Sequence, residues 1–146
     1  MHFVYTHAKK SGCVDAALHL VALINHQFGV KVRFYKSDNE QTLGGDFRDF
    51  TDLEGIIHKV SIIATLEQNG LAERSGGILI SRGRHMMVEA RLLLDMWPVS
   101  MNAAAYILNR TPAKSLGWRT PYKKATGIRL NIANLYTFGC RAYVRD

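Results

Sequence analysis

The chain has 146 residues, which is the usual length of one domain and too short for two of ordinary size. Apolar residues make up 47% of the chain, enough to build a core, and the 21% of charged residues is near the average for globular proteins. No apolar run approaches the roughly 18 residues of a membrane span, and the N-terminus lacks the charged-then-apolar order of a secretory signal. These features argue against a membrane or secreted protein.

The two cysteines, Cys13 and Cys140, lie far apart, and neither belongs to a CxxC motif. A structural zinc site and a disulfide framework are therefore not indicated. Isolated cysteines are typical of reducing compartments. We expect an intracellular protein of the nucleus or cytoplasm.

Charge is distributed unevenly along the chain. Residues 1–73 hold 7 Lys/Arg and 9 Asp/Glu, whereas residues 74–146 hold 12 Lys/Arg and 3 Asp/Glu. Nine of those 12 cations are arginines, whose planar fork suits phosphate. The asymmetry fits a protein that holds a polyanion near a carboxylate site, or simply one with a solvated basic face.

The first half of the chain alternates strand and helix signals. A short strand is predicted at residues 2–7, and a helix from Ser11, its cap, to Phe28, with Gly29 placed to end it. A second strand is expected at 30–35, a short helix at 46–53 that ends at Gly55, and a third strand at 56–60. A loop is expected over residues 61–70.

The second half is predicted to be mainly helical. A long helix should run from about residue 70 to 93, weakened by Gly76, Gly77 and Gly83. A further helix from Pro98 to Leu108 carries an apolar stripe, and a last strand is expected at 138–144. This order predicts an α/β fold with three or so strands, at least two of them parallel, flanked by helices.

Two carboxylates are expected near one edge of this sheet. Asp38 follows the 30–35 strand, and Glu73 lies in the first turn of the long helix that comes after the 56–60 strand. Ligand sites of open α/β sheets lie outside the carboxyl ends of the strands, and carboxylate oxygens suit Mg²⁺. The alternative is that Asp38 bonds its own loop backbone and Glu73 only favours the helix dipole.

Several local sequences, in order along nearly the whole chain, resemble the catalytic core of copia-like retrotransposon integrases. They are Ser37-Asp38-Asn39, Gly44-Gly45-Asp46-Phe47, Glu67-Gln68-Asn69-Gly70-Leu71-Ala72-Glu73-Arg74, Trp97-Pro98, Ala104-Ala105-Tyr106-Ile107-Leu108-Asn109-Arg110-Thr111-Pro112, Leu116-Gly117-Trp118, Thr120-Pro121-Tyr122 and Phe138-Gly139-Cys140-Arg141-Ala142-Tyr143. The stretch Arg74-Ser75-Gly76-Gly77 looks most like copies from fungi.

The resemblance implies an RNase H-like fold and Mg²⁺- or Mn²⁺-dependent DNA strand transfer by three acidic residues that hold two metal ions. Asp38 would be the second of these residues and Glu73 the third. Gln68 and Asn69 would begin the catalytic helix beside the DNA end; the alternative is an ordinary helix start. Residues 1–112 would form the catalytic core, and residues 113–146 would extend it and end in a strand.

The chain also departs from the family pattern. It opens at what corresponds to the third strand of the fold, so the first two strands and the first acidic residue have no counterpart in these 146 residues. We therefore expect a truncated core with an incomplete two-metal site that is inactive alone, and an exposed sheet edge that pairs copies into homo-oligomers. Alternatives are a non-enzymatic nucleic-acid-binding remnant and an interaction module.

The remaining candidates are basic and aromatic. Four arginines lie on or near the predicted long helix: Arg74, Arg82, Arg84 and Arg91. They could contact the DNA backbone, or they could simply form a solvated helix face. His85 reads as a surface or partly buried side chain rather than a base. Trp97, Trp118 and Tyr122 could stack on bases, although burial is the usual role of such residues.

Overall fold

The computed structural model describes residues 1–9, 12–37, 44–60 and 66–143. In chain order the helices and strands are α1 (Gly12–Phe28), β1 (Phe34–Ser37), α2 (Gly44–Leu53), β2 (Ile57–Val60), α3 (Leu66–Glu89), α4 (Trp97–Arg110) and α5 (Pro121–Thr126), with short 3₁₀ turns at Leu94–Met96 and Lys114–Leu116. Two compact units are formed, one by Tyr5–Arg74 and the other by Met1–Val4 with Ser75–Asp146.

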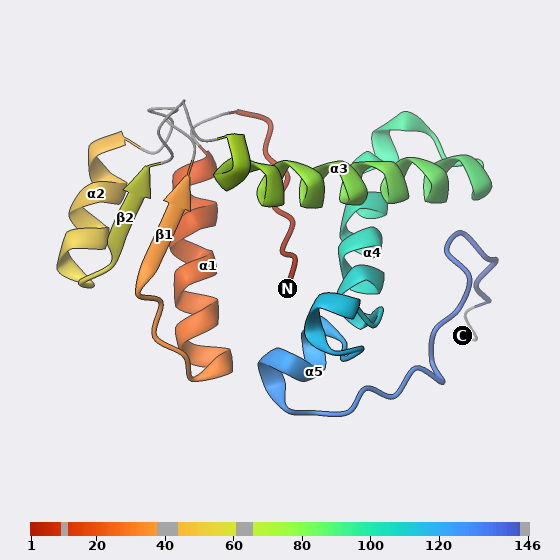
Figure 1. The fold of residues 1–146 in the computed structure, drawn as a ribbon. Coiled ribbons are helices and arrows are strands. Elements are labelled where there is room, and N and C mark those ends of the chain that lie inside the picture. The colour runs from red at the N-terminus through yellow and green to blue at the C-terminus, as the bar shows by residue number, and fades with distance from the viewer. Residues whose placement is uncertain (10–11, 38–43, 61–65, 144–146) are drawn as a thin grey trace. The chain divides into compact units, whose positions relative to one another are not determined.

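The first unit contains a parallel pair of strands. β1 and β2 lie side by side in the same direction, with Phe34 opposite Ile57 and Ser37 opposite Val60 (Figure 1). The α/β fold class and the parallel pair are thus confirmed. The core of this unit forms around the buried Phe47 of α2, whose ring packs edge-on against Tyr35 of β1 at a centroid distance of 4.7 Å. Such aromatic pairs add to the stability gained from burial.

The second unit is built on α4. Its buried side chains are mostly small, and Ala104 has no exposed surface. Met101, Ala104 and Ala105 of the predicted stripe are buried, whereas Leu108 is only partly so. Small residues let a neighbouring helix approach closely, and Gly83 and Met87 of α3 are buried in this unit.

Two predicted strands are absent from the part of the chain that the structure describes. Residues 2–7 and 138–143 are irregular, and Val144 lies outside the described residues. The Phe, Val and Tyr content of both segments favours strands, but a strand also needs a partner to hydrogen-bond. At the N-terminus the backbone of His2 instead pairs with the side chain of Asn109. The described sheet therefore has two strands rather than three.

The long helix is shifted toward the N-terminus relative to its predicted range of 70–93. α3 begins at Leu66, inside the segment expected to be a loop, and ends at Glu89. At its C-terminus the Arg91 amide donates to the Val88 carbonyl and the Leu92 amide to the Met87 carbonyl. This pair of bonds is a Schellman motif with Arg91 at its left-handed position, φ 51°. Since glycine usually occupies that position, the sequence held no cue for this stop.

Candidate nucleic-acid interface

Of the two predicted metal ligands, the structure describes one, Glu73. Glu73 lies in α3 with an exposed side chain. Asp38 lies outside the described residues; it follows Ser37, the last residue of β1, in the sequence. In the described ranges no group of three or more His, Cys, Asp or Glu side chains could hold a metal ion. The described side chains thus do not amount to a metal site, and the Asp38–Glu73 pair stays a prediction.

Gln68 and Asn69 fall within the first turn of α3, so their backbone is helical. This agrees with the expectation that they begin the helix, although not with the loop expected up to residue 70. Their side chains lie outside the described part of the chain. Their predicted contact with a DNA end therefore stays a prediction.

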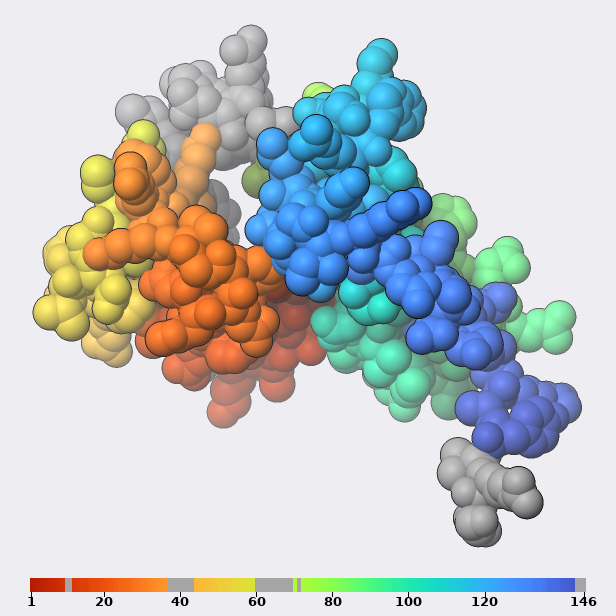
Figure 2. Space-filling view, turned by 90° about the horizontal axis from the view of Figure 1, so that it is seen from below, coloured from red at the N-terminus to blue at the C-terminus, as the bar shows by residue number. Residues whose placement is uncertain are grey.

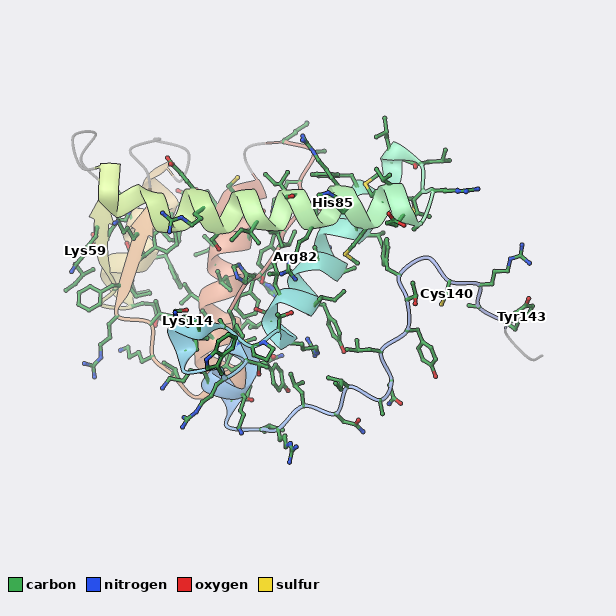
Figure 3. All side chains as sticks on the ribbon, turned by 45° about the vertical axis from the view of Figure 1, so that its right-hand side comes forward. Lys59, Arg82, His85, Lys114, Cys140 and Tyr143 are labelled. Atoms are coloured by element: carbon green, nitrogen blue, oxygen red, sulfur yellow. The ribbon has the colours of Figure 1, made fainter. Side chains whose placement is uncertain are left out.

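All four candidate arginines are exposed. Arg74, Arg82 and Arg84 are carried by α3, and Arg91 occupies the turn that ends it. Arg82 is labelled on α3 in Figure 3, beside His85. Arg74 belongs to the first unit, whereas Arg82, Arg84 and Arg91 belong to the second.

A groove brings two of these arginines together. Arg84 and Arg91 both line a depression of about 550 Å³ whose other walls are Met87, Val88, Leu92, Leu94 and Trp97. Arg84 also borders a neighbouring hollow of about 540 Å³ that includes Ser81 and His85. Nδ1 of His85 lies 2.7 Å from the Ser81 carbonyl oxygen, so a proton on Nδ1 donates this bond and the exposed ring is held along the helix.

The described residues 96–143 are part of a longer stretch that contains no carboxylate side chain. Between Asp95 and Asp146 the sequence holds eight Lys/Arg residues and no Asp or Glu. Charge counts over whole halves of the chain conceal this stretch; a shorter counting window would have found it. Six of the eight cations follow Lys114, five of them within the described residues, so the basic character continues beyond α4.

The aromatic candidates differ in exposure. Trp97 and Tyr122 are partly buried, and Arg110 stacks between Tyr106 and Tyr122, at 3.3 Å and 5.2 Å from the ring centroids. Trp118, by contrast, is 71% exposed. The expectation of burial is wrong for Trp118, which lies in a tight turn in a left-handed backbone conformation.

No protein-family model matches the sequence. Among curated proteins, the chain is 31% identical over 144 residues to the retrovirus-related Pol polyprotein from transposon RE2 of Arabidopsis thaliana, a match that covers 97% of this chain and 10% of that protein. It is 29% identical over 123 residues to the corresponding polyprotein from transposon TNT 1-94 of Nicotiana tabacum, covering 84% of this chain and 9% of that protein. The chain therefore spans about a tenth of the length of these relatives.

Solved structures give the fold. The catalytic core domain of HTLV-2 integrase, in complex with magnesium and in a trimeric form, matches with a TM-score of 0.61 and 21% identity over 80% of this chain and 71% of that one. A chain of the simian T-cell lymphotropic virus intasome in complex with the PP2A regulatory subunit B56 gamma matches with a TM-score of 0.65 and 19% identity, over 87% of this chain and 44% of that one.

The fold is thus that of a retroviral integrase catalytic core, which is RNase H-like. Its sequence relatives are retrotransposon Pol polyproteins, which agrees with the predicted resemblance to copia-like retrotransposon integrases. No described helix is both long and apolar enough to cross a membrane.

Proposed function

We propose that this chain is the DNA-binding core segment of a retrotransposon integrase, the class of enzyme that joins element DNA to a target. The observation that carries the proposal is the combination of relatedness to transposon polyproteins over 97% of the chain with an integrase-core fold. The protein would act in the nucleus, or in the cytoplasm on the element's DNA.

The exposed cations of the second unit support DNA as the partner. Arg84 and Arg91 line one groove, and Arg82 lies on the same helix. One guanidinium group can donate two parallel hydrogen bonds to the oxygens of a phosphate. Each phosphate that is neutralised in this way releases condensed counterions from the DNA. A surface of this kind binds duplex DNA with little sequence preference and with strong dependence on salt.

A binding series on duplex DNA tests this proposal. Fluorescence anisotropy of a labelled duplex at several KCl concentrations should give a slope of log K against log salt of about −0.9 for each phosphate contacted. Arg84→Gln combined with Arg91→Gln should reduce the magnitude of that slope by roughly 2 and weaken binding equally for unrelated sequences. The matched control is Arg48→Gln, because Arg48 is an exposed arginine on the acidic α2; it should change little.

A flat salt slope would contradict DNA binding and favour the alternative of an interaction module, which pairs with a partner through its sheet edge. A steep slope without any metal binding would favour the other alternative, a nucleic-acid-binding remnant without chemistry.

We further propose that Asp38 and Glu73 together hold Mg²⁺ or Mn²⁺. The parallel register of β1 and β2 supports this, since the carboxyl ends of the two strands meet at one edge of the sheet and Asp38 follows β1 directly. Such a metal, when bound, would supply the Lewis acid for phosphoryl transfer. Because the resemblance assigns only two of the three acidic residues to these 146 residues, we expect an incomplete two-metal site and no strand transfer by this chain alone.

Calorimetric titration with Mn²⁺ tests the pair independently of activity. The chain should bind Mn²⁺ in the millimolar range or tighter, and Asp38→Asn and Glu73→Gln should each abolish the binding. Asp15→Asn, which alters an exposed carboxylate of α1, is the control and should leave it intact. Binding that persists in Asp38→Asn would remove the metal assignment, and strand transfer that is lost in Glu73→Gln would overturn the expected inactivity.

A further inference from the structure

The turn between α4 and α5 is closed by its own backbone. Ala113 and Arg119 form an antiparallel bridge, in which the Ala113 amide donates to the Arg119 carbonyl at 3.2 Å. The Trp118 amide donates to the Ala113 carbonyl at 3.0 Å, and the residues between them include the 3₁₀ turn Lys114–Leu116. Thr120 then caps α5 by accepting from the Lys123 amide. These bonds hold residues 113–119, named here the 113–119 turn, in one conformation.

The tip of the 113–119 turn has two successive left-handed residues. Gly117 has φ 62°, which suits glycine, but Trp118 has φ 60°. A non-glycine residue in this region is uncommon and costs on the order of 1 kcal/mol, and such strain persists where the surrounding structure enforces it. Asn or Gly would occupy the same backbone at lower cost. The conformation therefore does not explain why this residue is a tryptophan.

Burial does not explain the tryptophan either. An indole gains stability for a protein when its large apolar surface leaves water, yet Trp118 is 71% exposed. Between Thr111 and Gly127, all of them described, Trp118 is the single large apolar side chain that is exposed. The fold thus holds a flat aromatic ring in solvent at the end of a fixed turn.

The surroundings of Trp118 are cationic. Lys114 and Arg119 lie on the same turn, and Lys123 and Lys124 lie on α5, which follows directly; all four are exposed. Figure 2 shows this part of the second unit, cyan to blue, at the surface, and Figure 3 labels Lys114 on the turn before α5. No Asp or Glu occurs from Met96 to Arg145 to offset these charges. The local field therefore favours a polyanion.

We propose that the 113–119 turn is a binding platform for unpaired nucleotides, in which Trp118 stacks on a base and the neighbouring cations contact the phosphates on either side. This rests on the proposed nucleic-acid function and adds to it a second surface and a single-stranded ligand. Paired bases have their faces covered by their neighbours, so an exposed indole can stack only where the strand is open. An anionic membrane would also attract lysines and an indole, so lipid vesicles form one arm of the test.

Tryptophan fluorescence provides a direct test. In a Trp97→Phe background Trp118 is the sole tryptophan, and titration with an oligothymidylate of about 20 nucleotides should quench its emission through base stacking. In the otherwise unaltered chain, anisotropy should show that Trp118→Leu binds the same oligonucleotide about 10-fold more weakly, whereas Trp118→Phe keeps most of the affinity. Tyr143→Leu, which alters an aromatic residue that is 89% exposed, is the control and should bind normally.

Three further measurements separate the explanations. An abasic strand should remove the difference between the unaltered chain and Trp118→Leu. Duplex affinity and its dependence on Arg84 and Arg91 should be the same with or without Trp118, which distinguishes failure of this proposal from failure of DNA binding as a whole. Equal oligothymidylate affinity of the unaltered chain and the Trp118→Leu variant would overturn the proposal. So would a blue-shifted emission with phosphatidylserine vesicles in the absence of quenching by oligothymidylate.

Discussion

Asn109 provides a single-residue substitute for strand pairing. Its side-chain amide is buried near the end of α4; Nδ2 donates to the His2 carbonyl oxygen and Oδ1 accepts from the His2 amide, each at 2.7 Å. A primary amide presents the same donor and acceptor pair as a peptide group. Burial lowers the pKa of His2, with a further contribution from the amino-terminal charge, and its Nδ1 lies 3.2 Å from the Ser75 hydroxyl. The N-terminal segment is therefore fixed by side chains rather than by a sheet.

Asn109→Leu should destabilise the chain by about 1–3 kcal/mol, because it leaves two partly buried backbone groups of His2 without their bonds. Differential scanning calorimetry should show a loss of roughly 2–4 °C in Tm per kcal/mol for a chain of this size. Asn102→Leu is the matched control, since Asn102 is an exposed asparagine of the same helix whose side-chain amide donates to the Pro98 carbonyl. Equal Tm values for the two variants would contradict this role.

Residue-level prediction from the sequence succeeded where a property is local. Gly55 ends α2 in a left-handed conformation, φ 65°, as its position predicted, and the candidate arginines of α3 are exposed as a charged helix face should be. Arg91 and Trp118 could not be recognised in this way. Both occupy left-handed positions that normally select glycine or asparagine, and only the hydrogen bonds of the surrounding turn reveal them.

Among the elements, α3 and α4 are packed closely through a glycine. A Cβ atom added at Gly83 would lie 2.6 Å from Sδ of Met101, whereas one added at Gly77 would meet nothing within 4 Å. Both glycines cost helix propensity relative to alanine. Alanine substitutions at the two positions therefore separate the effect of the Met101 contact on stability from the effect of helix propensity.

Gly77→Ala should stabilise the chain by about 1 kcal/mol, since alanine favours the helix and the site is open. Gly83→Ala should fail to give this gain, because Met101 must move to admit the methyl group. Urea denaturation followed by circular dichroism measures both changes. Combining Gly83→Ala with Met101→Ala should show positive coupling between the two substitutions. An equal gain at both glycines would mean that α3 and α4 do not depend on this contact.

The order of the elements and the parallel pair could be predicted because periodicity and turn residues act over short distances. The strands expected at 2–7 and 138–144 could not, because a strand forms only where another segment offers a partner. The expected start of α3 near residue 70 is also wrong, because residues 66–70, expected to belong to a loop, are helical. Of the candidate site, only the exposure of the arginines could be checked, since Asp38 lies outside the described residues; the DNA-contact and metal-binding roles stay predictions.

Considered as a whole molecule, the chain forms two units, Tyr5–Arg74 and Met1–Val4 with Ser75–Asp146, joined in sequence through α3. The predicted division at residue 112 into a core and an extension, and the association of copies through an exposed sheet edge, stay predictions. A sheet with two described strands is short by the standards of independently stable sheets.

The stretch from Met96 to Arg145 lacks histidine as well as carboxylates. Histidine is the side chain that ordinarily changes charge between about pH 5 and 8, and all six histidines of the chain lie at or before His85. The electrostatic pull of this stretch on a polyanion is consequently insensitive to acidification in that range. A proton-linked change in affinity within this range would ordinarily originate at one of the histidines, all of which lie among the first 85 residues.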